Sequence, residues 1–153
     1  MTPDTSFSLD ELPPVTSWFC DMDGVLVREN NAIAGAQEFL DTLHDLEIPF
    51  LVFTNNSIFT PRDLSARLMH SGLHVPEEHI WTSALATAAF LTQQSPESAA
   101  FVIGEAGMTT ALHEAGYVMT ETDPEYVVLG ETRSYDFNAI TQAIRFIDKG
   151  AKF

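Results

Sequence analysis

The stretch WFCDMDGVLV, at residues 18–27, joins a short apolar run to two carboxylates and a glycine. With the residues just before it, the apolar part (15–21) is typical of a buried strand that ends at Asp21. In an extended tail Asp21 and Asp23 would point the same way, and Gly24 would let the chain turn sharply out of the sheet. The stretch therefore predicts a strand that presents two acids at its carboxyl end.

A second apolar run, IPFLVF at residues 48–53, ends at the polar turn T-N-N. Between the two runs, the apolar residues of 35–47 follow helical spacing. A strand–helix–strand unit with the usual right-handed crossover places its strands parallel, and ligands of such sheets bind at the carboxyl edge. We therefore expect five polar residues to converge at one edge: Asp21, Asp23, Thr54, Asn55 and Asn56.

Helix and strand patterns alternate along the rest of the chain. Thr60 and Pro61 are typical helix-start residues, and Gly72 is typical of a helix end. The alternation predicts an α/β fold with a mostly parallel sheet. Further helices are expected at 83–94, 107–115 and 136–149, and further strands at 80–81, 100–103, 126–129 and from 151 onward.

Composition limits the classes of protein to consider. The chain has 153 residues and a formal charge of −15, from 22 acidic and 7 basic residues. Because nucleic acids and anionic membranes are bound by clustered cations, we expect neither among the partners. One cysteine excludes an internal disulfide, and no apolar run approaches the ~20 residues of a membrane helix. The start of the sequence lacks the apolar core of a signal peptide, so a cytoplasmic location is expected.

The expected convergence of acids and a hydroxyl group indicates phosphoryl transfer. A carboxylate at a strand end can act as a nucleophile, and a second one nearby can act as general acid and base. Paired carboxylates also attract Mg²⁺, which would offset the negative charge of the chain toward an anionic substrate. Each motif alone has a plainer interpretation, because acid pairs occur in solvated loops and T-N-N-S is ordinary turn composition. The combination favours catalysis.

The run WFCDMDGVLV followed by FLVFTNNS resembles the haloacid dehalogenase (HAD) superfamily of phosphohydrolases. Three further runs, TSALATAAFL, FVIGEAGMTTALHEAGY and YVVLGETRSYDFNAITQAIRFIDKGAKF, resemble its NagD / 4-nitrophenylphosphatase-like branch. The resemblance covers nearly the whole chain from about residue 15. It implies a Rossmann-like core with a large α/β cap inserted after the third strand.

The resemblance also implies roles for individual residues. Asp21 is similar in position to the nucleophile that becomes an aspartyl-phosphate, and Asp23 to the general acid and base. Both resemble Mg²⁺ ligands, Asp21 through its carboxylate and Asp23 through its backbone carbonyl. Thr54 and Asn55 resemble the phosphate-binding pair, and Asn56 is the next residue of the same turn.

Two features of the family are missing from this sequence. The family has a lysine beside the phosphorylated nucleophile and a late G-D-x-x-x-[ST]-D motif that completes the Mg²⁺ site. Here the lysines are Lys149 and Lys152, in the cap-like part, and the late motif does not occur. We therefore expect the N-terminal portion of such an enzyme, with impaired activity. The expected division is a lead-in at 1–14, the first part of the core at 15–97 and part of a cap at 98–153.

The expected substrate is a small phosphorylated metabolite. An incomplete sheet would leave edges and apolar faces uncovered, which favours homo-oligomers. Two other classes stay open: a non-catalytic module that keeps a metal or phosphate pocket for binding or assembly, and a receiver-type phosphoacceptor domain. The second class needs an acceptor aspartate at the end of a later strand, which Trp81-Thr82 and Leu129-Gly130 do not offer. Cys20 is interpreted as a small apolar core residue.

Overall fold

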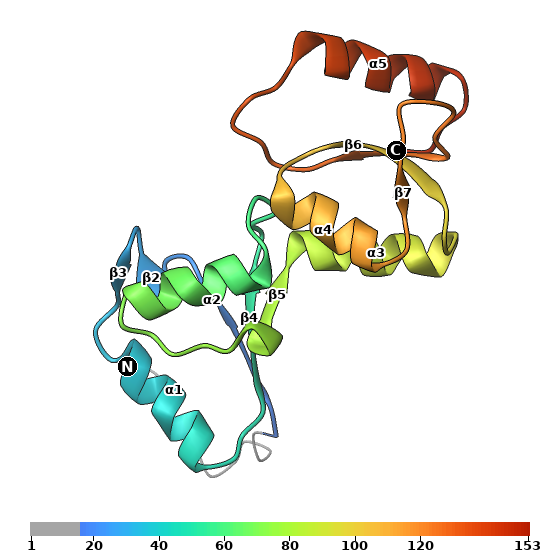
Figure 1. Cartoon of the computed structure of the whole chain (residues 1–153). Coiled ribbons are helices and arrows are strands. Elements are labelled where there is room, and N and C mark those ends of the chain that lie inside the picture. The colour runs from blue at the N-terminus through green and yellow to red at the C-terminus, as the bar shows by residue number, and fades with distance from the viewer. Residues whose placement is uncertain (1–15) are drawn as a thin grey trace, which may run out of the picture.

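Strands and helices alternate along residues 16–153, the part of the chain that this computed structural model describes. The predicted lead-in at 1–14 lies outside the described residues. Two units follow one another, each built on a parallel sheet (Figure 1). The first unit (16–82) contains β1 (Trp18–Asp21), β2 (Val27–Arg28), β3 (Asn31–Ala32), α1 (Ala36–Asp45), β4 (Phe50–Thr54), α2 (Pro61–His70), a 3₁₀ turn (Glu77–His79) and β5 (Ile80–Thr82). The second unit (83–153) contains α3 (Ser83–Gln94), β6 (Ala99–Ile103), α4 (Ala106–Glu114), β7 (Val118–Met119), β8 (Tyr126–Leu129) and α5 (Phe137–Asp148).

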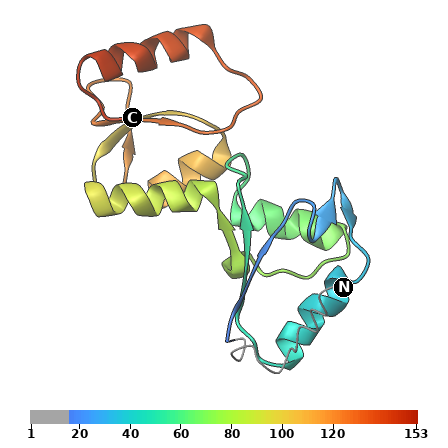
Figure 2. The ribbon, with the colours of Figure 1, turned by 180° about the vertical axis from the view of Figure 1, so that it is seen from behind.

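The sheet of the first unit has β4 in the middle, with β1 and β5 parallel to it on either side. Figure 2 shows β1 and β4 side by side. The register aligns Cys20 with Val52 and Val52 with Ile80, and all three side chains are buried. Leu40 of α1 and Leu64 of α2 belong to the same buried cluster. Because a slip of one residue would turn this row to the other face of the sheet, the burial of the row fixes the register.

The opposite face of the same sheet carries large side chains that the described residues leave exposed. Phe19, Phe53 and Trp81 alternate along their strands with the buried row, and they are 63%, 39% and 36% exposed. The rings of Phe19 and Phe53 lie 5.3 Å apart between centroids. An apolar face of this kind is typical of an interaction surface.

In the second unit, β6 lies between β7 and β8. Helices α3 and α4 pack on one face of this sheet and α5 on the other (Figure 1). Successive residues of β6 point to opposite faces of the sheet. Ala100 is buried with α3 and α4, whereas Phe101 is buried against α5. Helix α3 lies before the predicted division between 97 and 98, yet its buried residues belong to the apolar cluster of the second unit. The division between a core and a cap at this point stays a prediction.

The element boundaries follow the signals in the sequence. The Thr60 hydroxyl accepts a hydrogen bond from the Asp63 N–H, the Asp63 carboxylate accepts one from the Thr60 N–H, and Pro61 opens α2. Helix α3 and strand β8 have the predicted bounds. Strands β2, β3 and β7 were not predicted, because two residues are too few to show a period. Within 16–153 there is no helix of the length and apolar character that crossing a membrane requires.

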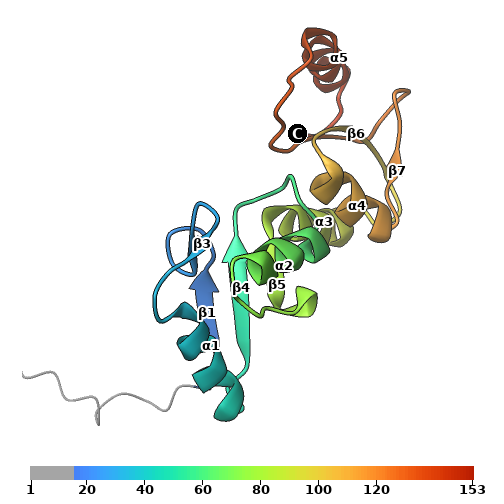
Figure 3. The same ribbon diagram turned by 60° about the vertical axis from the view of Figure 1, so that its left-hand side comes forward.

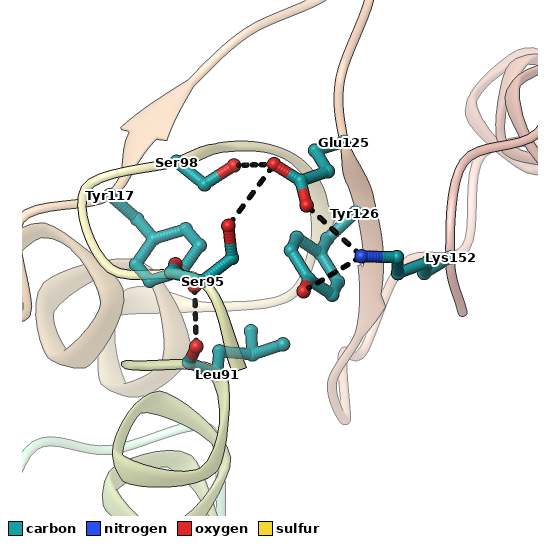
Figure 4. A network of polar contacts seen from close by, with 7 residues as sticks. All are labelled: Leu91, Ser95, Ser98, Tyr117, Glu125, Tyr126 and Lys152. Carbon is teal, nitrogen blue, oxygen red and sulfur yellow. Dashed lines mark hydrogen bonds and ion pairs between the residues drawn. The ribbon is translucent and has the colours of Figure 1, made fainter. Parts of the chain in front are cut away.

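A polar network fixes the entry into β8 and the residues after α5 (Figure 4). Glu125 accepts hydrogen bonds from Ser98 Oγ at 2.5 Å, from Ser95 Oγ at 3.3 Å and from Lys152 Nζ at 3.1 Å. The Ser98 hydroxyl, and then the Lys152 ammonium, hold the pKa of the Glu125 carboxyl below its ordinary value. The Val127 N–H donates to the Lys152 carbonyl at 2.8 Å, and an isolated parallel bridge joins Lys152 to Tyr126 where a further strand was expected to begin.

We expect Thr60→Ala to lower the free energy of unfolding by about 1 kcal/mol, because the first turn of α2 loses its capping box. Thr60→Ser keeps the hydroxyl and should stay within about 0.5 kcal/mol of the unmodified chain. Chemical denaturation followed by circular dichroism measures both variants. An equal loss in the two would contradict a capping role for the hydroxyl.

Candidate active site

The carboxyl ends of β1 and β4 meet at one edge of the first sheet. The register pairs Asp21 with Phe53, and the Met22 N–H donates to the Phe53 carbonyl at 3.0 Å. Thr54 follows directly and closes β4. The predicted parallel pairing is therefore confirmed, and it places Asp21 and Thr54 at the same edge of the first sheet.

The turn after β1 is held by its own backbone. The Met22 carbonyl accepts hydrogen bonds from the N–H groups of Leu26 and Val27, and the Gly24 N–H donates to the Val27 carbonyl at 2.7 Å. Gly24 has φ 83°, a left-handed conformation that glycine adopts without strain. The Met22 side chain is buried in the turn, whereas Asp21 and Asp23 on either side of it are exposed at the edge. The Asp21 carboxylate accepts from the Met22 N–H at 2.8 Å.

Thr54 connects the two turns. Its Oγ1 donates to Asp23 Oδ2 at 3.4 Å, across 31 positions of sequence, and accepts from the Asn56 N–H at 3.1 Å. Only 5% of Thr54 is exposed, so its hydroxyl is fixed in place. The structure therefore brings Asp23, Thr54 and Asn56 into one chain of hydrogen bonds, and Asp21 adjoins this chain through β1.

The two asparagines differ in what their side chains do. Asn56 Oδ1 accepts from the N–H groups of Ile58 at 3.0 Å and Phe59 at 2.9 Å, so this side chain shapes the turn from within. Asn55 is exposed at the edge, and its carbonyl accepts from the Ser83 hydroxyl at 2.8 Å. Of the two, Asn55 has the side chain that faces solvent at the carboxyl edge.

The donor chemistry of the edge fits a hard divalent cation in part. Carboxylate oxygens are the ligands that Mg²⁺ prefers, and it commonly keeps waters and substrate oxygens as the others. The Asp21 carboxylate and the Asp23 backbone carbonyl could supply oxygen ligands, and the one ion pair within residues 16–153 is between Lys152 and Glu125, elsewhere in the fold. The described part of the chain holds no group of three or more acidic, histidine or cysteine side chains that could bind a metal by itself.

Two arginines lie close to this edge. Arg67 of α2 lines a small hollow together with Asp23, and its guanidinium lies 4.7 Å from the centre of the Phe59 ring. Arg133, from the loop after β8, lies 5.9 Å from the same ring. Both guanidinium groups therefore lie near the Phe59 ring, and Arg67 shares the lining of a hollow with Asp23.

Cys20, the residue before the first acid, is 8% exposed. Burial, and then the charge of Asp21, raise the pKa of its thiol. A protonated, buried thiol is a poor nucleophile, which agrees with its interpretation as a core residue.

Sequence reasoning missed two residues that hold the turn after β4. The Ser57 hydroxyl is buried and accepts from the Glu131 N–H at 2.8 Å, and the Gly107 N–H donates to the Ile58 carbonyl at 2.8 Å. Gly107 offered little signal, because the predicted helix begins at this residue and does not enclose it. Ser57 had none beyond its place in the T-N-N-S run.

The fold and this edge define a class of protein: an α/β protein with a Rossmann-like sheet and a D-x-D-G turn at the carboxyl end of its first strand. Within that class, residues 18–118 match the haloacid dehalogenase-like hydrolases, and the chain belongs to this family.

Relatives and solved structures support the NagD-like branch. Over 137 residues the chain is 60% identical to a dihydroxyacetone phosphatase of Corynebacterium glutamicum, a match that covers 90% of the chain and 50% of that protein. Over 134 residues it is 40% identical to the ribonucleotide monophosphatase NagD of Escherichia coli, covering 88% and 53%. The solved structure of NagD from that organism has a TM-score of 0.86 at 39% identity, covering 91% and 55%. The chain spans about half the length of the curated relatives it matches.

We expect Thr54→Val to make the Asn56 amide hydrogen exchange about fivefold faster, because the isosteric side chain removes its acceptor. Thr54→Ser retains the hydroxyl and should keep the protection. Hydrogen exchange followed by NMR reads the amide directly. Unchanged protection in the valine variant would show that the hydroxyl does not hold the turn.

Proposed function

We propose that this edge is the active site of a Mg²⁺-dependent phosphomonoester hydrolase that acts through an aspartyl-phosphate. The observation that carries the proposal is the Thr54–Asp23 hydrogen bond, because it joins the hydroxyl at the end of β4 to a carboxylate two residues after Asp21, the last residue of β1. Membership of the haloacid dehalogenase-like hydrolases and similarity to proteins named as phosphatases support it.

In the proposed reaction an Asp21 oxygen attacks the phosphorus of the ester, and the bond from phosphorus to the leaving oxygen breaks. Asp23 gives its proton to that oxygen and later takes one from the water that hydrolyses the aspartyl-phosphate, which restores both carboxyl groups. The Thr54 hydroxyl and the Asn55 N–H would hold the phosphoryl oxygens, and the Asn56 N–H would keep the Thr54 hydroxyl in place from within the turn. Mg²⁺, held by the Asp21 carboxylate and the Asp23 backbone carbonyl, would offset the negative charge between the acids and the ester.

Substrate, partners and location belong to the same proposal. Similarity to a dihydroxyacetone phosphatase and a ribonucleotide monophosphatase supports a small phosphorylated metabolite, and dihydroxyacetone phosphate is the first to test. The exposed apolar face of the first sheet supports self-association. A single buried cysteine is compatible with a reducing, cytoplasmic location.

A trapping experiment tests the nucleophile. With Mg²⁺ and beryllofluoride, which mimics a phosphoryl group on an aspartate, we expect a bound fluorine signal in ¹⁹F NMR that disappears in Asp21→Asn. Asp45→Asn, which removes an exposed acid at the end of α1, is the matched control and should keep the signal. The absence of a bound signal in the unmodified chain, or its persistence in Asp21→Asn, would overturn the proposal.

A second candidate function is a non-catalytic module that binds a metal or phosphate. The observation that favours it is the position of Lys152, which is engaged by Glu125 in the second unit and does not serve the carboxyl edge. The two candidates differ in turnover. A module of this kind would bind Mg²⁺ through its acids but release no inorganic phosphate from any phosphomonoester, in this chain or a longer one.

A further inference from the structure

The residues that follow β4 touch the second unit directly. We call residues 54–59 the phosphate turn. The Gly107 N–H of α4 donates to the Ile58 carbonyl at 2.8 Å, and the Glu131 N–H, just after β8, donates to the buried Ser57 Oγ at 2.8 Å. Figure 3 shows the phosphate turn rising from β4 toward the start of α4. The start of α4 and the residue after β8 therefore both form hydrogen bonds with the phosphate turn.

The contact at Gly107 is too close for any side chain. A Cβ at this position would lie 2.5 Å from the Phe59 carbonyl oxygen and 2.7 Å from that of Ser57. Both neighbours are backbone atoms, so no side-chain rotation relieves the overlap. Glycine is among the least favourable residues inside a helix, and this approach of the phosphate turn explains its presence in α4.

Hydrogen bonds within the phosphate turn connect these contacts to the carboxyl edge of the first sheet. Asn56 Oδ1 accepts from the N–H groups of Ile58 and Phe59, and the Asn56 N–H donates to the Thr54 hydroxyl. Thr54 in turn donates to Asp23. A shift at Ile58 therefore moves the groups that would face a phosphate.

The two segments of the second unit that contact the phosphate turn are also hydrogen-bonded to each other. Glu105, the residue before α4, accepts from Thr132 Oγ1 at 2.6 Å and from the Arg133 N–H at 3.4 Å. The Thr132 hydroxyl and then the Arg133 N–H lower the pKa of the Glu105 carboxyl, so it remains ionised at neutral pH. Two hydrogen bonds therefore join the loop after β8 to the start of α4, and the Arg133 guanidinium lies 5.9 Å from the centre of the Phe59 ring.

We propose that the second unit sets the shape of the phosphate turn, with Gly107 and Ser57 as positioning residues. This inference rests on the proposed function, since it assigns the turn to phosphate. It implies that phosphate affinity depends on two residues that would not touch phosphate. If the second unit only shielded the carboxyl edge from solvent, it would need no backbone hydrogen bonds to the phosphate turn.

The test compares Gly107→Ala and Ser57→Ala with two controls in the ¹⁵N-labelled chain. Gly104→Ala adds the same methyl group at the same junction, but its three nearest atoms belong to Met108 and Gly130 and not to the turn. Ser65→Ala removes a hydroxyl that donates to the Val75 carbonyl, elsewhere in the first unit. Each variant is titrated with inorganic phosphate in the presence of Mg²⁺, and amide NMR signals report on every segment.

We expect Gly107→Ala and Ser57→Ala to shift the amide signals of residues 54–59 and to raise the Kd for phosphate about tenfold. The controls should stay within about twofold of the unmodified chain. If Gly107→Ala unfolds the second unit, seen as loss of the β6 and β8 signals, Ser57→Ala decides. Unchanged turn signals and unchanged affinity in Ser57→Ala would overturn the inference.

The same data separate this inference from the proposed function. If phosphate shifts no signal of the unmodified chain, the proposed function fails. The free-state signals of residues 54–59 in the two variants then still decide whether the second unit positions the turn.

Discussion

The parallel pairing of β1 with β4 is the constraint on which the rest of the structure depends. The buried row formed by Cys20, Val52 and Ile80 fixes the register, because a slip of one residue would expose it. That register ends β1 at Asp21 beside Phe53, one residue before Thr54. Apolar packing in the first unit thus determines where the acids and the hydroxyl meet.

Charge gives this edge its chemical character. The chain carries 22 acidic and 7 basic residues, and its one ion pair within residues 16–153 lies in the second unit, between Glu125 and Lys152. Asp21 and Asp23 are exposed at the edge, and the metal ion of the proposed function would be their counter-charge. The same ion would let an acidic surface accept a negatively charged ester.

Much of this arrangement could be predicted from the sequence. The D-x-D-G and T-N-N motifs each follow an apolar run, and the crossover rule converts their order along the chain into proximity. The caps of α2 and the bounds of α3 and β8 follow from local residue types. These features depend on neighbours in sequence, or on topology that has few alternatives.

Other features could not be predicted, because they depend on contacts between distant segments. Ser57 and Glu131 are 74 positions apart, and no local pattern marks their hydrogen bond. The role of Asn56 in shaping the turn required the positions of the Ile58 and Phe59 N–H groups. Helix α3 has a weak amphipathic pattern, so its packing with the second sheet was not visible in the sequence.

Paramagnetic Mn²⁺ in place of Mg²⁺ tests the central claim most directly, because it broadens the amide NMR signals of the residues around it. If the two strand ends share one metal-binding edge, substoichiometric Mn²⁺ will broaden the signals of residues 21–24 and of 54–56 together, and Asp21→Asn will abolish both effects. Broadening of only one of these segments, or of neither, would contradict the account.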